Sequence, residues 1–231
     1  MEKIKEPLKL GAILGAIALV IAVMLSFVNS ITAERIEAVN AQIIQDGLKE
    51  VMSSSGETEF IPMGGVDLTN SQNIEISSLY IAIDANENVI GYCATVMPNG
   101  YGGSIETIVG MNLSGTITGV KVTSNMSETA GLGAKAKSRE EFTYQFEQKT
   151  APFKLAKDGG AIDAITSATI TSRAITDGVN AAAEVMQKNN IYGEFSKEDI
   201  IDGKYTVKAE NPPEENSEEA NSEEGEVAEN E

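Results

Sequence analysis

The fold is decided by residues 79–123, LYIAIDANENVIGYCATVMPNGYGGSIETIVGMNLSGTITGVKVT, in which extended apolar segments alternate with turn residues. Segments rich in β-branched and aromatic residues predict four strands, at Leu79–Asp84, Val89–Val96, Ile105–Met111 and Thr116–Thr123. Short turn-like stretches join the members of each pair, Ala85–Asn88 in the first and Asn112–Gly115 in the second. Connections of this length favour an antiparallel meander over crossover units.

Helical apolar spacing on both sides of these strands predicts the partners of the sheet. The predicted helices are Thr32 to about Met52, Ser138–Gln148 and about Ser172–Asn189. Ser138 is the expected N-cap of the second helix, with Glu141 in the capping-box position, and residues 57–76 show turn signals without clear periodicity. An antiparallel sheet with packed helices is an α+β fold.

An apolar stretch near the N-terminus predicts a membrane anchor. The 21 residues from Leu8 to Val28 are rich in Leu, Ile, Val and Ala and span about 30 Å as a helix, the thickness of the hydrocarbon core of a bilayer. Lysines 3, 5 and 9 lie at its start, which places the N-terminus in the cytoplasm and the rest of the chain outside. A cleaved signal peptide is the alternative, but the length of the stretch and its continuation as a helical pattern favour a retained single-pass anchor.

The expected organisation has four parts. Residues 1–30 form the cytoplasmic N-terminus and transmembrane anchor, 31–76 a helical stalk and connection, 77–207 the extracytoplasmic domain, and 208–231 an acidic disordered tail. From Glu210 onward all ten charged residues are Glu, and the tail has almost no large apolar residues. An acidic docking arm for a partner is the alternative interpretation of this tail.

Composition excludes several kinds of chemistry. The chain has no histidine and one cysteine, so it lacks a Ser-His or Cys-His pair, an imidazole metal site and a CxxC redox pair. The formal charge of −18 argues against nucleic acid as a partner. Cys93 lies among strand-forming residues and is expected in the core, so redox activity requires a bound organic cofactor.

One short run offers a place for such a cofactor. Asp163-Ala164-Ile165-Thr166-Ser167-Ala168-Thr169 resembles the signal by which bacterial flavin transferases attach flavin mononucleotide (FMN) to a threonine through a phosphoester. Thr169 matches the acceptor, within a run that also contains Thr166, Ser167 and Ala168, and Asp163 is the expected recognition residue for the transferase. Such recognition can use the metal ion of phosphoryl transfer.

The chemistry of a helix start suits a phosphodiester. Free backbone N–H groups and the positive end of the helix dipole stabilise an anion there, and Thr171 and Ser172 add hydroxyls that can bond phosphate oxygens. The alternative is that these hydroxyls only cap the helix. Capping needs one such residue, whereas residues 166–172 contain five.

The wider sequence resembles the G subunit of the Rnf complex, the membrane-bound ferredoxin:NAD⁺ oxidoreductase of bacteria. It is more distantly similar to the C subunit of the sodium-pumping NADH:quinone reductase. We call residues 163–169 the attachment run. Besides this run and the anchor, the matching blocks are Gly100–Gly103 with the following strand, Glu128–Gly133 and Lys157–Gly160. The resemblance covers roughly residues 5–190. Ala130 replaces the usual proline, a histidine before Glu128 is missing, and Ser167 stands where glycine is common.

The resemblance implies which residues contact a flavin. Besides the attachment run and Thr171, these are Tyr101, Glu128, Thr129, Gly131, Leu132 and Gly133. The competing interpretation is local, since Gly100–Gly103 can be a simple turn and the loop glycines can supply only backbone freedom.

The function implied is electron transfer within an ion-pumping complex, with covalent FMN on Thr169. The expected partners are the other membrane, iron–sulfur and flavin subunits, together with a flavin transferase during maturation. Catalysis would belong to the assembled complex at the cell membrane. The alternatives are a flavin domain of another membrane reductase or redox sensor, and a membrane-tethered assembly module without cofactor.

Overall fold

The computed structural model describes residues 2–52, 58–86, 88–125, 128–138, 140–189, 191–192, 200–203 and 206–207. The helices and strands, in chain order, are α1 Glu2–Val51, β1 Glu59–Pro62, β2 Glu75–Ile83, β3 Val89–Met97, β4 Glu106–Asn112, β5 Ile117–Ser124, η1 Gly133–Lys137, α2 Glu140–Thr143, η2 Tyr144–Phe146, η3 Ala156–Asp158, α3 Thr169–Lys188, β6 Ile191–Tyr192 and β7 Thr206–Val207. The predicted acidic tail at 208–231 lies outside the described residues.

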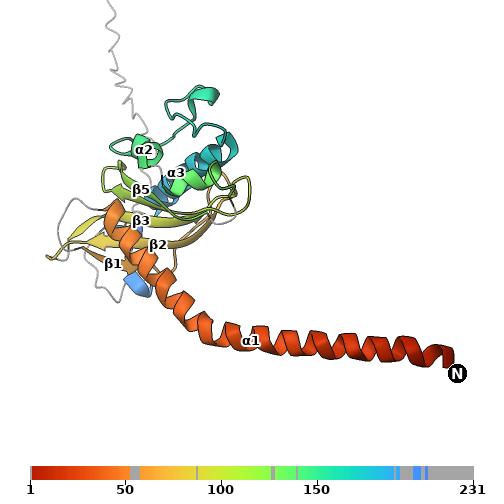
Figure 1. The fold of residues 1–231 in the computed structure, drawn as a ribbon. Helices are drawn as coiled ribbons and strands as arrows, with labels where there is room; N and C mark the ends of the chain where they lie inside the picture. Colours follow the sequence, from red (N-terminus) through yellow and green to blue (C-terminus); the bar gives the residue numbers. More distant parts are fainter. Residues whose placement is uncertain are drawn as a thin grey trace, which may run out of the picture.

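The main sheet is an antiparallel meander with the strand order β1-β2-β3-β4-β5. Its central strands are buried on both faces, since residues 91–96 of β3 are buried without interruption. Ala94 belongs to the core that includes α3, whereas Cys93 belongs to a second core with the end of α1. Helices α1 and α3 therefore cover opposite faces of the sheet (Figure 1), and the predicted α+β fold is confirmed.

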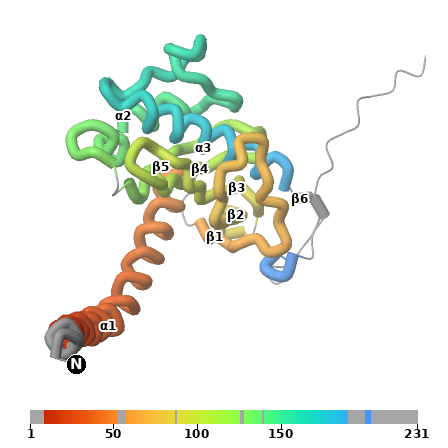
Figure 2. The backbone as a smooth tube through the Cα atoms, turned by 90° about the vertical axis from the view of Figure 1, so that its right-hand side faces the viewer, coloured from red at the N-terminus to blue at the C-terminus, as the bar shows by residue number. Residues whose placement is uncertain are grey.

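The predicted anchor and stalk form one helix, α1, of 50 residues. Within the described residues it is the one helix long and apolar enough to cross a membrane. Its last turns reach the sheet beside β5 (Figure 2). Glycines make this approach possible, because a Cβ on Gly119 would lie 2.8 Å from the Val51 Cα and one on Gly110 would lie 2.8 Å from the Val51 carbonyl oxygen. These two glycines are paired across β4 and β5, so together they leave a flat surface on which the end of the helix packs.

The predicted helix at 138–148 is confirmed only in part. Residues 140–146 are helical, as the short pieces α2 and η2, and these two pieces and the preceding η1 pack over β5. Ser138 does not cap a helix there, because its hydroxyl donates to the Lys135 carbonyl. Tertiary packing decides the local structure: Phe142 and Phe153 each lie edge-to-face against Phe146, with ring centroids 5.6 and 5.2 Å away.

Two further elements differ from the prediction. Strand β1 was not predicted, since only four residues pair with β2 and Pro62 ends the strand. Helix α3 starts at Thr169, three residues before the predicted start at Ser172. Thr169 is therefore the first residue of the helix and does not lie ahead of it.

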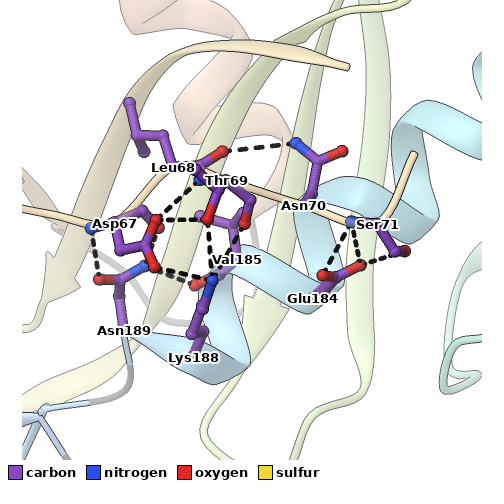
Figure 3. A network of polar contacts seen from close by, with 9 residues as sticks. All are labelled: Asp67, Leu68, Thr69, Asn70, Ser71, Glu184, Val185, Lys188 and Asn189. Atoms are coloured by element: carbon purple, nitrogen blue, oxygen red, sulfur yellow. Dashed lines mark hydrogen bonds and ion pairs between the residues drawn. The ribbon is translucent and has the colours of Figure 1, made fainter. Parts of the chain in front are cut away.

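Residues 66–72 tie the far end of α3 to the sheet through polar contacts (Figure 3). The side-chain amide of Asn189 donates to the Asp67 carbonyl, and Lys188 forms a 2.7 Å ion pair with the Asp67 carboxylate. The Lys188 ammonium, with the Thr69 hydroxyl, holds the pKa of Asp67 well below its usual range. Along the helix, Glu184 accepts hydrogen bonds from the backbone and hydroxyl of Ser71. These contacts fix the C-terminal half of α3, while its first turn lies at the candidate site.

Candidate functional site

Three segments that are separate in the sequence meet at the carboxylate of Glu128, which is 7 % exposed. One carboxylate oxygen accepts the Gly102 N–H at 3.0 Å, and the other accepts the Thr171 hydroxyl at 2.7 Å. Glu128 thus joins the turn at residues 100–103, its own loop and the first turn of α3. Hydrogen bonds to a buried carboxylate are among the stronger polar contacts in proteins.

Close packing around Glu128 explains two of the glycines. A Cβ on Gly100 or Gly133 would overlap a carboxylate oxygen of Glu128. These glycines allow the three segments to come together, which goes beyond a simple turn. Gly131 differs, because its φ of +78° places it in the left-handed region and a Cβ there would meet open space. Of the three glycines Gly100, Gly131 and Gly133, only Gly131 is explained by backbone freedom.

The loop after Glu128 has a defined shape. The Thr129 carbonyl accepts the N–H groups of Leu132 and Ala134, at 3.1 and 3.2 Å. The side-chain amide of the buried Asn125 donates to the Ala134 carbonyl. Thr129, Ala130 and Gly131 remain exposed at the tip of the loop. The loop is therefore closed by its own backbone, with Ala130 at its exposed tip.

Exposed apolar side chains lie next to each segment that Glu128 holds. Tyr101 is 70 % exposed, Leu132 is 40 % exposed and Ile170 is 53 % exposed. Each of these residues directly precedes one that packs against Glu128. These following residues are Gly102, Gly133 and Thr171, respectively. We call Tyr101, Leu132 and Ile170 the apolar rim. The sequence predicted the first two and missed Ile170, whose only signal is a large apolar residue directly after Thr169.

The attachment run forms a tight turn that leads into α3. The Ala168 N–H bonds to the Ile165 carbonyl at 2.9 Å, and Ser167 has a φ of +64°. A positive φ at Ser167 is the conformation that glycine adopts most easily. Thr166 and Ser167 are exposed, Ala168 is buried and Thr169 is half-buried.

Capping does not account for the hydroxyls of this run. The N-cap position is occupied by Ala168, which has no hydroxyl, and no side chain caps the helix there. The Ser172 hydroxyl instead accepts the Ile165 N–H and donates to the Ala168 carbonyl, so it braces the turn from inside. Thr171 is 1 % exposed, and its hydroxyl points to Glu128. The Thr169 hydroxyl differs from both, since it neither braces the turn as Ser172 does nor bonds to Glu128 as Thr171 does.

A lysine contacts the hydroxyl of Thr169. Lys157, on η3, places its Nζ 3.1 Å from the Thr169 Oγ1. The next residue, Asp158, forms two 3.0 Å hydrogen bonds with Arg173, one turn further along α3. This ion pair lowers the pKa of Asp158 and raises the pKa of Arg173. Sequence reasoning noted the Lys157–Gly160 block without assigning a role to the lysine.

Asp163 lies at the other end of the turn. Its backbone is fixed by Gln145, which accepts the Asp163 N–H at 2.7 Å and donates to the Asp163 carbonyl at 3.1 Å. The residue itself is exposed. The carboxylate therefore stands on a fixed backbone at the surface, where another protein can reach it.

Comparison with known proteins agrees with this arrangement. Residues 100–184 match the FMN-binding domain, a range that contains Glu128, Lys157 and Thr169, and residues 1–51 match the RnfG N-terminal region. The chain is 35 % identical over 196 residues to the G subunit of the Na⁺-translocating ferredoxin:NAD⁺ oxidoreductase complex of Acetobacterium woodii, covering 79 % of this chain and 93 % of that protein. The chain belongs to the RnfG family.

Other members of the RnfG family are similarly close. The G subunit of the ion-translocating oxidoreductase complex of Methanosarcina acetivorans is 31 % identical and covers 80 % of this chain and 96 % of its own length. The corresponding protein of Haemophilus influenzae strain PittEE is 30 % identical, with 82 % and 94 % covered. Among the described elements, the region matched to the RnfG N-terminal region coincides with α1, and the FMN-binding match contains the site around Glu128.

Proposed function

We propose that this chain is an electron-transfer subunit of an ion-pumping ferredoxin:NAD⁺ oxidoreductase complex and carries FMN linked through a phosphoester to Thr169. The observation that carries the proposal is the position of Thr169. It starts a helix of 20 residues, its hydroxyl is contacted by a lysine, and the next residue belongs to the apolar rim.

The two ends of FMN find different surroundings here. The phosphodiester would lie at the start of α3, where free N–H groups and the helix dipole stabilise a negative charge. The flavin ring would lie against the apolar rim of Tyr101, Leu132 and Ile170, with the exposed loop at Thr129 and Gly131 beside it. Glu128 and Thr171 would act from below by holding the three segments together.

Covalent attachment also suits the proposed location. We place the N-terminus in the cytoplasm and the FMN domain outside, on the basis of the lysines before the apolar segment. A cofactor lost on that side could not be replaced easily, and an ester makes retention independent of binding affinity. The ring can then stay open to the neighbouring subunits that exchange electrons with it. A flavin transferase would attach the FMN, with Asp163 as its recognition residue.

Labelling of Thr169 tests the attachment. The full chain is expressed in membranes with a flavin transferase, and the denatured protein is examined by in-gel flavin fluorescence and intact mass spectrometry. The expected result is one added FMN phosphoryl group, abolished in Thr169→Ala and partly retained in Thr169→Ser. Thr150→Ala is the matched control, since Thr150 is an exposed threonine outside the attachment run. A wild-type chain without flavin, or an unchanged label in Thr169→Ala, would overturn the proposal.

A single introduced cysteine tests the orientation. Cys93 is fully buried and burial raises the pKa of its thiol, so the wild-type chain should not react with a membrane-impermeant maleimide. Ser114 is exposed in the turn between β4 and β5. Ser114→Cys should be labelled from outside the cytoplasmic membrane in spheroplasts. Labelling only after the membrane is opened would place the domain in the cytoplasm.

A further inference from the structure

We infer that Lys157 takes part in the attachment reaction itself, by stabilising the phosphoryl group as Thr169 is esterified and by neutralising the diester afterwards. This inference rests on the proposed function. Its starting point is the 3.1 Å contact between the Lys157 Nζ and the Thr169 Oγ1, the atom that would form the new bond.

The contact puts a positive charge where negative charge would develop. The non-bridging phosphate oxygens would be two bonds away from the Thr169 Oγ1, within reach of a lysine already bonded to that atom. A lysine is a common phosphate-binding group because its ammonium acts as a compact positive charge. A preorganised charge aimed at the transferred group stabilises the transition state more than the ground state.

The position of Lys157 is fixed by its neighbour. Thr169 and Arg173 are four residues apart and lie on the same side of α3. Two neighbouring residues of η3 contact this side of the helix. Lys157 contacts the Thr169 hydroxyl, and Asp158 accepts two hydrogen bonds of 3.0 Å from Arg173. Asp158 and Arg173 are therefore positioning residues that hold η3 against the helix.

The loop that carries this pair is closed tightly. The Gly160 N–H bonds to the Leu155 carbonyl at 2.9 Å, and the Ala156 N–H bonds to the Ile162 carbonyl at 2.8 Å. Gly159 ends η3 with a φ of +82°, in the left-handed region that favours glycine. The lysine side chain is long, but its backbone is held in one place.

Charge makes this lysine more important than a typical surface lysine. The chain has a formal charge of −18, and Asp163 stands at the other end of the same turn. Asp158 is paired with Arg173, whereas Lys157 contacts Thr169 and can attract an incoming anionic donor there.

The reaction can be written with a flavin dinucleotide as the donor, such as flavin adenine dinucleotide. The Thr169 Oγ forms a bond to the phosphorus of the FMN half, and the bond from that phosphorus to the bridging oxygen of the nucleotide half breaks. The nucleoside monophosphate leaves with the electron pair of the broken bond. The hydroxyl proton passes to a base of the transferase.

The test measures the initial rate of labelling of the purified full chain in detergent, with flavin transferase, Mg²⁺ and flavin adenine dinucleotide. Lys157→Gln should label at least about tenfold more slowly, equivalent to about 1.4 kcal/mol in the barrier. Lys157→Arg should recover much of the rate, since it restores the charge. Lys154→Gln, on the same loop, is the matched control and should stay within about twofold of wild type.

A second measurement separates a chemical role from misfolding. The ³¹P resonance of the labelled chain should shift in Lys157→Gln relative to wild type and to Lys154→Gln, because the charge beside the diester is lost, whereas thermal unfolding should be unchanged. Equal labelling rates for Lys157→Gln and wild type would overturn the inference and leave attachment at Thr169 standing. A wild-type chain that takes no flavin would overturn both.

Discussion

Replacing Thr171 by valine tests whether Glu128 holds the site together. Valine keeps the volume of threonine and removes one hydroxyl, which donates to the Glu128 carboxylate at 2.7 Å. Both residues are buried, at 1 % and 7 % exposed, so water cannot easily replace the lost partner. A hydrogen bond to a buried charged group contributes about 1.5–3 kcal/mol to the free energy of unfolding. At roughly 2–4 °C per kcal/mol, the melting temperature should fall by about 3–12 °C.

The assay is thermal unfolding of the full chain in detergent. Near-ultraviolet circular dichroism of the six tyrosines reports tertiary structure, since the chain has no tryptophan. Hydrogen exchange of peptides covering residues 99–103 and 129–134 gives a local readout, because Glu128 bonds to Gly102 and carries the loop. Both regions should exchange faster in Thr171→Val. Thr171→Ser keeps the hydroxyl and should restore most of the stability.

Two results would refute this reasoning. If Thr171→Val melts within about 1 °C of wild type, the hydrogen bond to Glu128 does not contribute as its burial predicts. If Thr171→Ser is as unstable as Thr171→Val, keeping the hydroxyl does not preserve stability, and the hydrogen bond to Glu128 is not what holds the site together. In either case, the convergence of the three segments would need another cause.

Three further predictions concern the surroundings of the site. Gly119→Ala should lower the free energy of unfolding by about 1–3 kcal/mol, because its Cβ would lie 2.8 Å from the Val51 Cα, and this is measured by thermal unfolding. Asp158→Asn should leave the melting temperature nearly unchanged, since its ion pair with Arg173 is exposed to solvent, yet slow the flavin labelling of the chain; an unchanged labelling rate would contradict its positioning role. Asp177→Asn should slightly stabilise the fold at pH 7, because burial raises the pKa of this carboxyl and its ionisation therefore opposes folding. That gain should disappear in melts below about pH 3.9, where the carboxyl is protonated in the unfolded chain as well.

The sheet could be predicted because its signal is local. Each of the strands β2 to β5 has apolar and β-branched residues over most of its length, and short turns separate β2 from β3 and β4 from β5. Antiparallel pairing then follows from the short connections. Strand β1 has too few residues for such a signal, and its pairing with β2 depends on the fold as a whole.

The helix predicted at 138–148 is shorter in the structure for a different reason. Its spacing fits a helix, but Phe142 and Phe146 pack into an aromatic cluster with Phe153, which lies beyond the predicted helix, and this cluster sets the backbone around them. Propensity and capping signals are weak compared with tertiary contacts of this kind.

The candidate site was only partly visible in the sequence. The motif blocks marked the segments, but their meeting point at Glu128 depends on partners 26 and 43 residues away, Gly102 and Thr171. The contact of Lys157 with Thr169 depends on the turn at Gly159 and on the ion pair of Asp158. These contacts form only in the folded chain, and the spacing of residues in the sequence does not predict them.

The uninterrupted α1 helix has a mechanical consequence. About 23 residues separate Val28 from Val51, so roughly 35 Å of helix lies between the end of the apolar span and the sheet. The last turns of α1 pack directly on the glycines of β4 and β5, so this end of the helix is fixed against the sheet. A redox centre on this domain would thus stay at a fixed distance from the apolar span. Electron donors and acceptors must therefore be positioned next to it by the surrounding assembly.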